Sequence, residues 1–220
     1  RASYGGVVYL SRIDVHSAVV SSALLATVPE ARGQDGWDES GHASRAAHHV
    51  VRRVARESIT DGQRRRLQLA TLQRAASLGI GSVHEIAGPD ISSEADLTAL
   101  LRLAEGEPGP EVAPYWGELG EAGVARALEL GAVGAAGDLF ADGSIGSHTA
   151  ALGAPYADAA HCGHAYLTAA QVRDHVVACT RAGLQAGFHA IGDGALDAVA
   201  AGLAEAADLV GVDAVRAARH

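Results

Sequence analysis

Histidine and carboxylate side chains follow three of the four apolar runs in the later part of this 220-residue chain. These residues are His84 with Glu85, then Asp138, and then His189. In an α/β barrel the carboxyl ends of the parallel strands meet on one side, and that side carries the active site. Imidazole and carboxylate groups are the ligands that zinc and similar divalent ions take. The joint pattern therefore favours a metal site with His189, Asp138 and Glu85 as ligands, and with His84 as the alternative to Glu85. Taken singly, His84 and Glu85 could instead cap a helix or bond a loop, and Asp138 could be a buried carboxylate that backbone amides satisfy.

Two further aspartates lie close to this set in the sequence. Asp142 begins the loop 142–150, whose glycines allow close backbone approach and whose Ser, His and Thr side chains offer hydrogen-bond donors. Asp193 stands four residues after His189. Both aspartates are candidate catalytic residues, although Asp142 also suits a turn and Asp193 also suits the start of a helix.

The elements that must position these residues alternate between two hydrophobic periods. The expected strands are 7–10, 80–86, 111–116 and 184–189, and a further strand is expected within 132–141. The expected helices are 17–26, 43–55, 60–79, 93–104, 118–130, 168–182 and 193–209, and capping boxes at Thr60–Gln63 and Thr168–Gln171 begin two of them. Alternating strands and helices predict right-handed βαβ units and a parallel sheet, either a barrel or an open doubly wound sheet. No glycine-rich phosphate-binding motif follows any strand, which disfavours a nucleotide-binding sheet.

Composition limits the classes of partner. The chain has 48% hydrophobic residues and a net charge of −9 at pH 7, which suits one domain or part of a larger one and disfavours nucleic acid. The basic run Arg64–Arg66 falls on an expected helix and suits a solvated face. No apolar run is long enough to span a bilayer and no signal peptide is recognisable, so we expect a cytoplasmic protein that acts on a small molecule.

Four segments make the chain resemble the metal-dependent amidohydrolase superfamily, in the subgroup called amidohydrolase family 3, which includes N-substituted formamide deformylases. These segments are 12–18 with 21–24, 79–85, 142–150 with 155–156, and 189–193. The third reads D-G-S-I-G-S-H-T-A and the fourth reads H-A-I-G-D. The resemblance covers nearly the whole chain.

The resemblance implies a (β/α)8 TIM barrel with a small β-rich domain and one or two divalent ions, usually zinc. It implies hydrolysis of an amide or related C–N bond by water that the metal activates. His189 would be the metal ligand of the fifth strand. The substrate pocket would be lined by Asp14, His16 and His148.

Other parts of the family pattern are not found in this sequence. They are the H-x-H of the first strand, the histidine of the sixth strand and the aspartate of the eighth. We therefore expect a fragment with about strands 2–5 of the barrel, in which residues 41–220 are the central part of the hydrolase domain and residues 1–40 are a substrate-side insertion or linker. Such a fragment would have little activity, and its exposed apolar edge would favour association with a partner, for example as a homo-oligomer.

Several positions depart from the family pattern. Asp138 stands where many members have a lysine that can be carbamylated, and His148 stands where an arginine is common. A carboxylate at 138 would bind one metal directly or leave the site mononuclear. The alternative function is a non-catalytic α/β binding module that retains the barrel scaffold. Schiff-base chemistry is excluded within this segment, because the chain contains no lysine.

Overall fold

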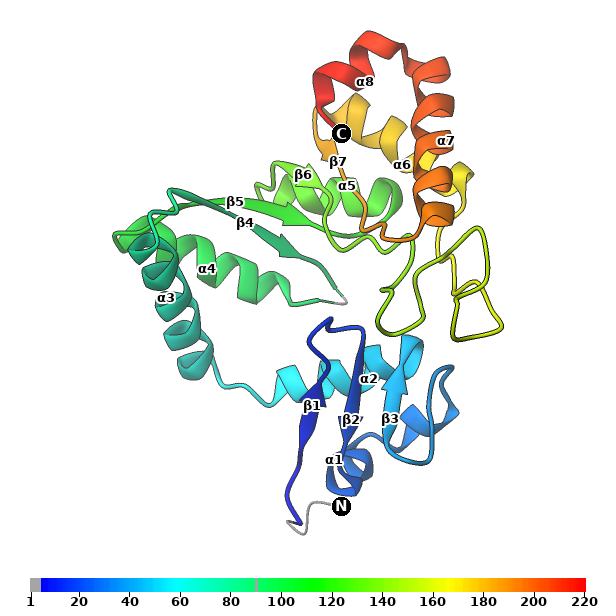
Figure 1. Cartoon of the computed structure of the whole chain (residues 1–220). Helices are drawn as coiled ribbons and strands as arrows, with labels where there is room; N and C mark the ends of the chain where they lie inside the picture. Colours follow the sequence, from blue (N-terminus) through cyan, green and yellow to red (C-terminus); the bar gives the residue numbers. More distant parts are fainter. Residues whose placement is uncertain (1–4, 90) are drawn as a thin grey trace. The chain divides into compact units, whose positions relative to one another are not determined.

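The computed structural model describes residues 5–89 and 91–220, which fall into two compact units (Figure 1). The first unit contains the residues up to Ile59, Asp142–Ala165 and Ile191–Gly194. The second unit contains Thr60–Ala141, Tyr166–Ala190 and Ala195–His220. Two loops from late in the chain therefore belong to the same unit as its beginning. None of the helices in the described parts of the chain is long and apolar enough to cross a membrane.

The first unit is built on a small antiparallel sheet in the order β1-β2-β3. Its elements are β1 (Tyr9–Ser11), β2 (Ser17–Val20), α1 (Ser22–Thr27), the 3-10 helix η1 (Pro29–Gly33), β3 (His42–Ser44) and α2 (Arg45–Glu57). Val20 and Ala43 from the sheet pack with Leu24 of α1 and Val51 of α2 in one apolar core.

The prediction of a helix over 17–26 is wrong for its first five residues. Ser17–Val20 forms the central strand of the sheet and pairs with both neighbours. Its two valines are β-branched and fit a pleated surface well. The helix begins only after Ser21, whose hydroxyl accepts the backbone N–H of Leu24 at 3.2 Å. Pairing with distant strands has overridden the local helical pattern here.

The second unit alternates helices with a four-stranded parallel sheet in the order β4-β5-β6-β7. Its elements are α3 (Asp61–Ser77), β4 (Ser82–Ala87), α4 (Glu94–Gly106), β5 (Glu111–Trp116), α5 (Gly120–Glu129), β6 (Gly134–Ala135), α6 (Ala169–Ala182), β7 (Gln185–Ala186), α7 (Asp193–Val210) and α8 (Val212–Ala218). The α/β prediction is confirmed, and so are the capping boxes that begin α3 and α6. Closure of such a sheet into a barrel stays a prediction.

One face of this sheet is covered by helices and is called the helix face below. Ala87 of β4 and Trp116 of β5 are register partners, and both lie in a core with residues of α4, α5, α6 and α7. Because side chains alternate along a strand, His84 points to the opposite face. Its ring lies 5.4 Å from that of Tyr115, which is on the same face.

Tyr115 lies across two further strands on this opposite face. Its hydroxyl donates to Oε1 of Gln185 in β7 at 2.7 Å. A Cβ at Gly134 in β6 would lie 2.8 Å from the Tyr115 ring, so only glycine fits beneath it. One tyrosine thus holds the register of three neighbouring strands.

The strand β6 lies within the stretch 132–141 as expected, whereas β7 is shorter than the predicted strand 184–189. Regular pairing covers two residues of each, and a single parallel bridge between Phe140 and His189 follows. Between the Ala135–Ala186 pair and that bridge, the segment after β6 advances five residues and the segment after β7 advances three. Two extra residues therefore bulge out of the β6 segment near Asp138.

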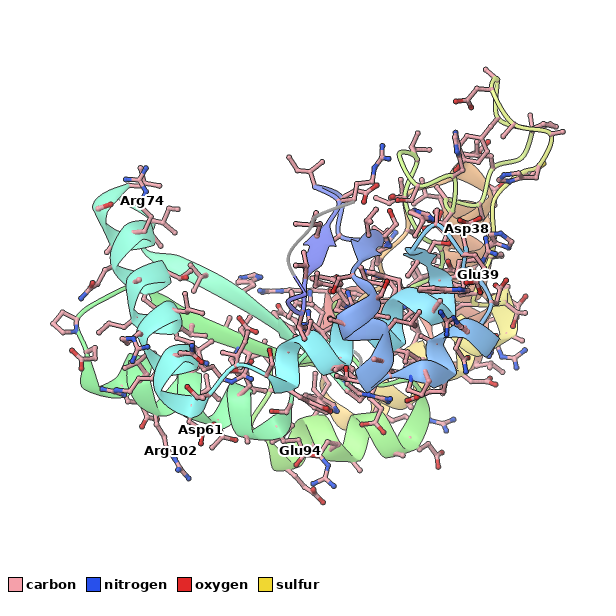
Figure 2. All side chains as sticks on the ribbon, turned by 90° about the horizontal axis from the view of Figure 1, so that it is seen from below. Asp38, Glu39, Asp61, Arg74, Glu94 and Arg102 are labelled. Atoms are coloured by element: carbon pink, nitrogen blue, oxygen red, sulfur yellow. The ribbon has the colours of Figure 1, made fainter. Side chains whose placement is uncertain are left out.

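Charged residues of the second unit are dispersed over its surface. The labelled side chains of α3 and α4 (Asp61, Arg74, Glu94 and Arg102) project away from the ribbon in Figure 2. Within the predicted basic run, Arg64 pairs with Asp96 at 3.3 Å and Arg65 pairs with Glu107 at 3.4 Å. The run is therefore a helix surface whose charge is partly balanced by carboxylates.

Candidate active site

The predicted site residues are divided between the two units. The predicted metal ligands Glu85, Asp138 and His189 belong to the second unit. The predicted catalytic and substrate-binding residues belong to the first unit, and they are Asp14, His16, Asp142, His148 and Asp193.

His189 lies just past β7 on the opposite face of the sheet. Phe188, the residue before it, packs into the helix-face core, so the alternation of side chains directs His189 the other way. The backbone of His189 is held on both sides: its N–H donates to the Leu139 carbonyl at 2.9 Å, and its carbonyl accepts the N–H of Ala141 at 2.8 Å. The imidazole meets the Phe140 ring edge-on, with centroids 5.1 Å apart.

Asp138 lies in the bulge next to this ladder. Gly137 before it has φ +113°, and a Cβ there would lie 2.1 Å from Cγ2 of Ile86. Only glycine permits this backbone course. The bulge therefore places a half-buried carboxylate two residues before Phe140, the bridge partner of His189.

Glu85 lies on the helix face, unlike His189. Val83 and Ala87, which share its side of β4, pack into the two cores beneath the helices. Burial, and then the negative charge of Asp96 on α4, raise the pKa of the Glu85 carboxyl. Sequence alone could not distinguish Glu85 from His84, because the two faces of a strand are defined only by what packs on them.

The strand register also separates Glu85 from His189. The register aligns Ile86 with Gln185, through Tyr115 and Gly134 in the strands between them. Glu85 lies one residue before this line, and His189 lies four residues after it. The two positions are thus five residues apart along the strands, or about 17 Å. The donor atoms of two ligands of one zinc ion lie within about 4 Å of each other. The register therefore argues against Glu85, and equally against His84, as a ligand beside His189.

The donors of the second unit fit part of a divalent-metal site. His189 and Asp138 have the chemistry of zinc ligands and lie at the same end of the sheet. Among residues 5–89 and 91–220, however, no three His, Cys, Asp or Glu side chains are grouped closely enough to hold a metal ion. His189 and Asp138 as ligands of one metal ion stay a prediction.

Asp142 is fully buried, and its carboxylate is occupied by backbone donors. Oδ2 accepts the N–H groups of Ala151 and Gly192 at 2.8 and 2.7 Å, and Oδ1 accepts the N–H of Ile191 at 2.9 Å. Three such bonds satisfy a carboxylate in a dry site without a cation. This geometry suits a residue that organises loops.

Asp193 also serves the backbone. Its Oδ1 accepts the N–H of Gly153 at 2.9 Å, and it is the first residue of α7. Gly192 beside it is tightly enclosed, since a Cβ there would lie 1.9 Å from the Ala151 carbonyl oxygen. The turn after His189 is thus fastened to the loop 142–153 by several bonds.

Asp14 fixes the same loop from another direction. Its Oδ2 accepts the hydroxyls of Ser144 and Ser147 at 2.9 and 2.8 Å and lies 3.2 Å from Nε of Arg12. Its Oδ1 accepts the N–H of His16 at 3.2 Å. Burial opposes ionisation, but the Ser147 hydroxyl and the other donors outweigh it and lower the pKa of Asp14.

His148 lies on the outer part of the loop with a positive φ of 53°. Its Nε2 is 2.9 Å from Oδ1 of Asp158, and its ring meets Tyr156 edge-on at 4.8 Å. Its side chain is 39% exposed, so it remains accessible to a ligand in solution.

The sequence is matched by the model of the amidohydrolase family over residues 1–220. The chain belongs to the amidohydrolase family. This family assignment agrees with the resemblance of the D-G-S-I-G-S and H-A-I-G-D segments. No protein of curated function shows significant sequence similarity to the chain.

Two solved structures are similar to this amidohydrolase chain. An uncharacterized metal-dependent hydrolase from Pyrococcus furiosus has 26% identity and a TM-score of 0.64, with 91% of this chain and 44% of that chain covered. An uncharacterized metal-dependent hydrolase from Pyrococcus horikoshii has 24% identity and a TM-score of 0.64, with 93% of this chain and 42% of that chain covered. At this identity the similarity shows the fold alone. The chain thus spans less than half the length of either structure.

Two buried histidines of this amidohydrolase chain were not predicted from the sequence. Nε2 of His48 lies 2.8 Å from the Tyr9 hydroxyl in the first unit. Nδ1 of His175 accepts the N–H of Gly120 at 3.0 Å in the second unit, and its Nε2 lies 2.8 Å from the Ala135 carbonyl oxygen. Both are within predicted helices, and only their positions beside apolar neighbours could have suggested burial.

Proposed function

We propose that the protein hydrolyses a C–N bond, of the amide or formamide type, in a small-molecule substrate, with a divalent metal such as zinc. The observation that carries this proposal is the placement of His189. It stands at the carboxyl end of a parallel strand, on the face opposite the helices, with its backbone bonded on both sides. Family membership supports the hydrolytic reaction.

His189 would bind the metal through a neutral imidazole, with Asp138 as the second ligand from this chain. The chemistry that zinc supplies in hydrolases is polarisation of the scissile carbonyl and activation of water near neutral pH. The work of the first unit is different. There the bonds from Asp14 and Asp142 hold the loop 142–150 in one conformation, and the partly exposed His148 offers a polar group to the substrate.

Five predictions about the site stay predictions in this proposal: His189 and Asp138 as ligands, His16 and His148 as substrate-binding residues, and zinc as the ion. A TIM barrel, a cytoplasmic location and a homo-oligomeric state also stay predictions. Asp193 is assigned to the start of α7 and to Gly153, since its carboxylate bonds that backbone N–H.

The test is metal binding by the full-length protein, with variants chosen by the register. Zinc affinity is measured by competition with a chromophoric chelator. His189→Ala should weaken binding at least tenfold, whereas Glu85→Gln and His84→Ala should leave it unchanged, because those side chains lie about 17 Å or more along the strands from His189. A panel of N-substituted formamides and amides tests hydrolysis in parallel.

The outcomes separate the two candidate functions. Zinc binding together with turnover supports the hydrolase. Absence of both in the full-length protein would favour the non-catalytic binding module. Loss of zinc affinity in Glu85→Gln but not in His189→Ala would refute the ligand assignment.

A further inference from the structure

The buried carboxylate of Asp142 joins two of the four segments that carry the family resemblance. Asp142 is the first residue of D-G-S-I-G-S, and its partners Ile191 and Gly192 belong to H-A-I-G-D. The third partner, Ala151, directly follows the segment 142–150 in the chain. All these bonds lie within the first unit.

Further bonds of the first unit surround the same turn. The N–H of Gly194 donates to the Ala151 carbonyl at 3.0 Å, and the N–H of Gly153 donates to Asp193 at 2.9 Å. Gly192 fits only because it lacks a Cβ, which would lie 1.9 Å from the Ala151 carbonyl oxygen. The turn is therefore fixed in one conformation by the buried loop beside it.

This turn begins two residues after His189 in the chain. Both the N–H and the carbonyl of His189 are held by the ladder to Leu139 and Ala141 in the second unit. Asp142 directly follows Ala141 in the chain and bonds the N–H groups of Ile191 and Gly192 within the first unit. The turn that Asp142 holds is therefore joined to His189 through Ala190 alone.

We propose that Asp142 is a positioning residue that fixes the turn 191–192, which follows the proposed ligand His189 in the chain, and that it moves no proton in the reaction. Its full burial separates it from solvent, and three backbone donors occupy its oxygens. Its role toward a metal rests on the proposed function. Its role in fixing the turn does not.

An amide at position 142 keeps the shape of the side chain but reverses part of its chemistry. The NH₂ group of Asn would face at least one backbone N–H, so that donor meets donor. Each N–H group that faces the NH₂ would lose its acceptor, which costs as much as a lost hydrogen bond to a charged group. The turn should then open more often, and the chain next to His189 should become less ordered.

The first measurement needs no variant. Amide hydrogen exchange of the wild-type protein is followed by NMR, and we expect slow exchange at Ile191 and Gly192. The Ile191 side chain is 48% exposed and neither residue lies in a helix or strand, so only the bonds to Asp142 account for such protection. Fast exchange at both amides in the folded protein would overturn the proposal.

The second measurement compares Asp142→Asn with Asp197→Asn, an exposed aspartate on α7. In Asp142→Asn we expect exchange at Ile191 and Gly192 to accelerate by about tenfold or more. We also expect zinc affinity of the full-length protein to fall at least tenfold, with the pH profile of kcat unchanged. Asp197→Asn should match the wild type in all three readouts.

The results distinguish this proposal from failure of the proposed function. Unchanged zinc affinity with a lost limb of the kcat pH profile would make Asp142 a proton-transfer group and overturn the proposal. A wild-type protein that binds no zinc would refute the metal-dependent function, while the exchange rates would still decide whether Asp142 fixes the turn. Unchanged exchange in folded Asp142→Asn would refute that as well.

Discussion

The buried imidazole of His48 predicts that the first unit loses stability below neutral pH. His48 is 2% exposed and lies in the helix α2. Burial, and then the neighbouring positive charges led by Arg52, lower the pKa of His48 from 6.5 to about 3. The unfolded chain therefore takes up a proton near pH 6.5, and the folded unit does not until about pH 3.

The sign and size follow from this difference. The contribution of the neutral His48 to the free energy of unfolding is fully present above pH 6.5. It is lost as the pH falls from 6.5 toward 3, because the proton binds preferentially to the unfolded state. At pH 5 the unfolded imidazole is protonated and the folded one is neutral, so one site contributes a loss of about 2 kcal/mol relative to pH 8. This corresponds to roughly a thirtyfold larger population of the open state.

The assay is amide hydrogen exchange of the slowest amides in α2 at pH 8 and pH 5, corrected for intrinsic rates. His48→Gln retains a polar group that can reach the Tyr9 hydroxyl and should show about 2 kcal/mol less pH dependence than the wild type. His42→Asn is the matched control, because His42 is exposed on β3 and should not alter the dependence. Equal pH dependence in the wild type and in His48→Gln would refute the reasoning.

Two further predictions concern single contacts. Gly192→Ala should lower the free energy of unfolding of the first unit by about 2 kcal/mol or more, because its Cβ would lie 1.9 Å from the Ala151 carbonyl oxygen. Gly33→Ala is the control: its Cβ would meet nothing within 4 Å, so it should change the free energy of unfolding in urea by less than about 0.5 kcal/mol. Thr60→Ala removes the hydroxyl that accepts the N–H of Gln63 and should lower the stability of α3 by about 1 kcal/mol, visible as faster exchange in its first turn. An unaltered first turn in the Thr60 variant, or equal effects of the two glycine substitutions, would contradict these contacts.

Features set by neighbouring residues were predictable from the sequence. The capping boxes at Thr60 and Thr168 depend on a side chain three residues away, and both begin helices as predicted. The alternation of apolar runs predicted four parallel strands in chain order. The D-G-S-I-G-S and H-A-I-G-D motifs pointed to the family that the whole chain matches.

Features set by distant residues were not predictable in this way. Ser17–Val20 is a strand because β1 and β3 flank it, although its local pattern continued into a helix. Within 132–141 regular pairing covers only Gly134 and Ala135, because the backbone bulges around Gly137 before a single bridge forms at Phe140.

The candidate site shows the same division between local and tertiary information. The sequence by itself determined that His189 follows an apolar strand and that Asp142 and Asp193 lie near turns. Only the tertiary structure decided that Glu85 faces the helices and that Asp142 is buried among backbone N–H groups. The physical reason is that residue types and spacing fix which groups a chain offers, whereas burial and strand register fix which of them meet.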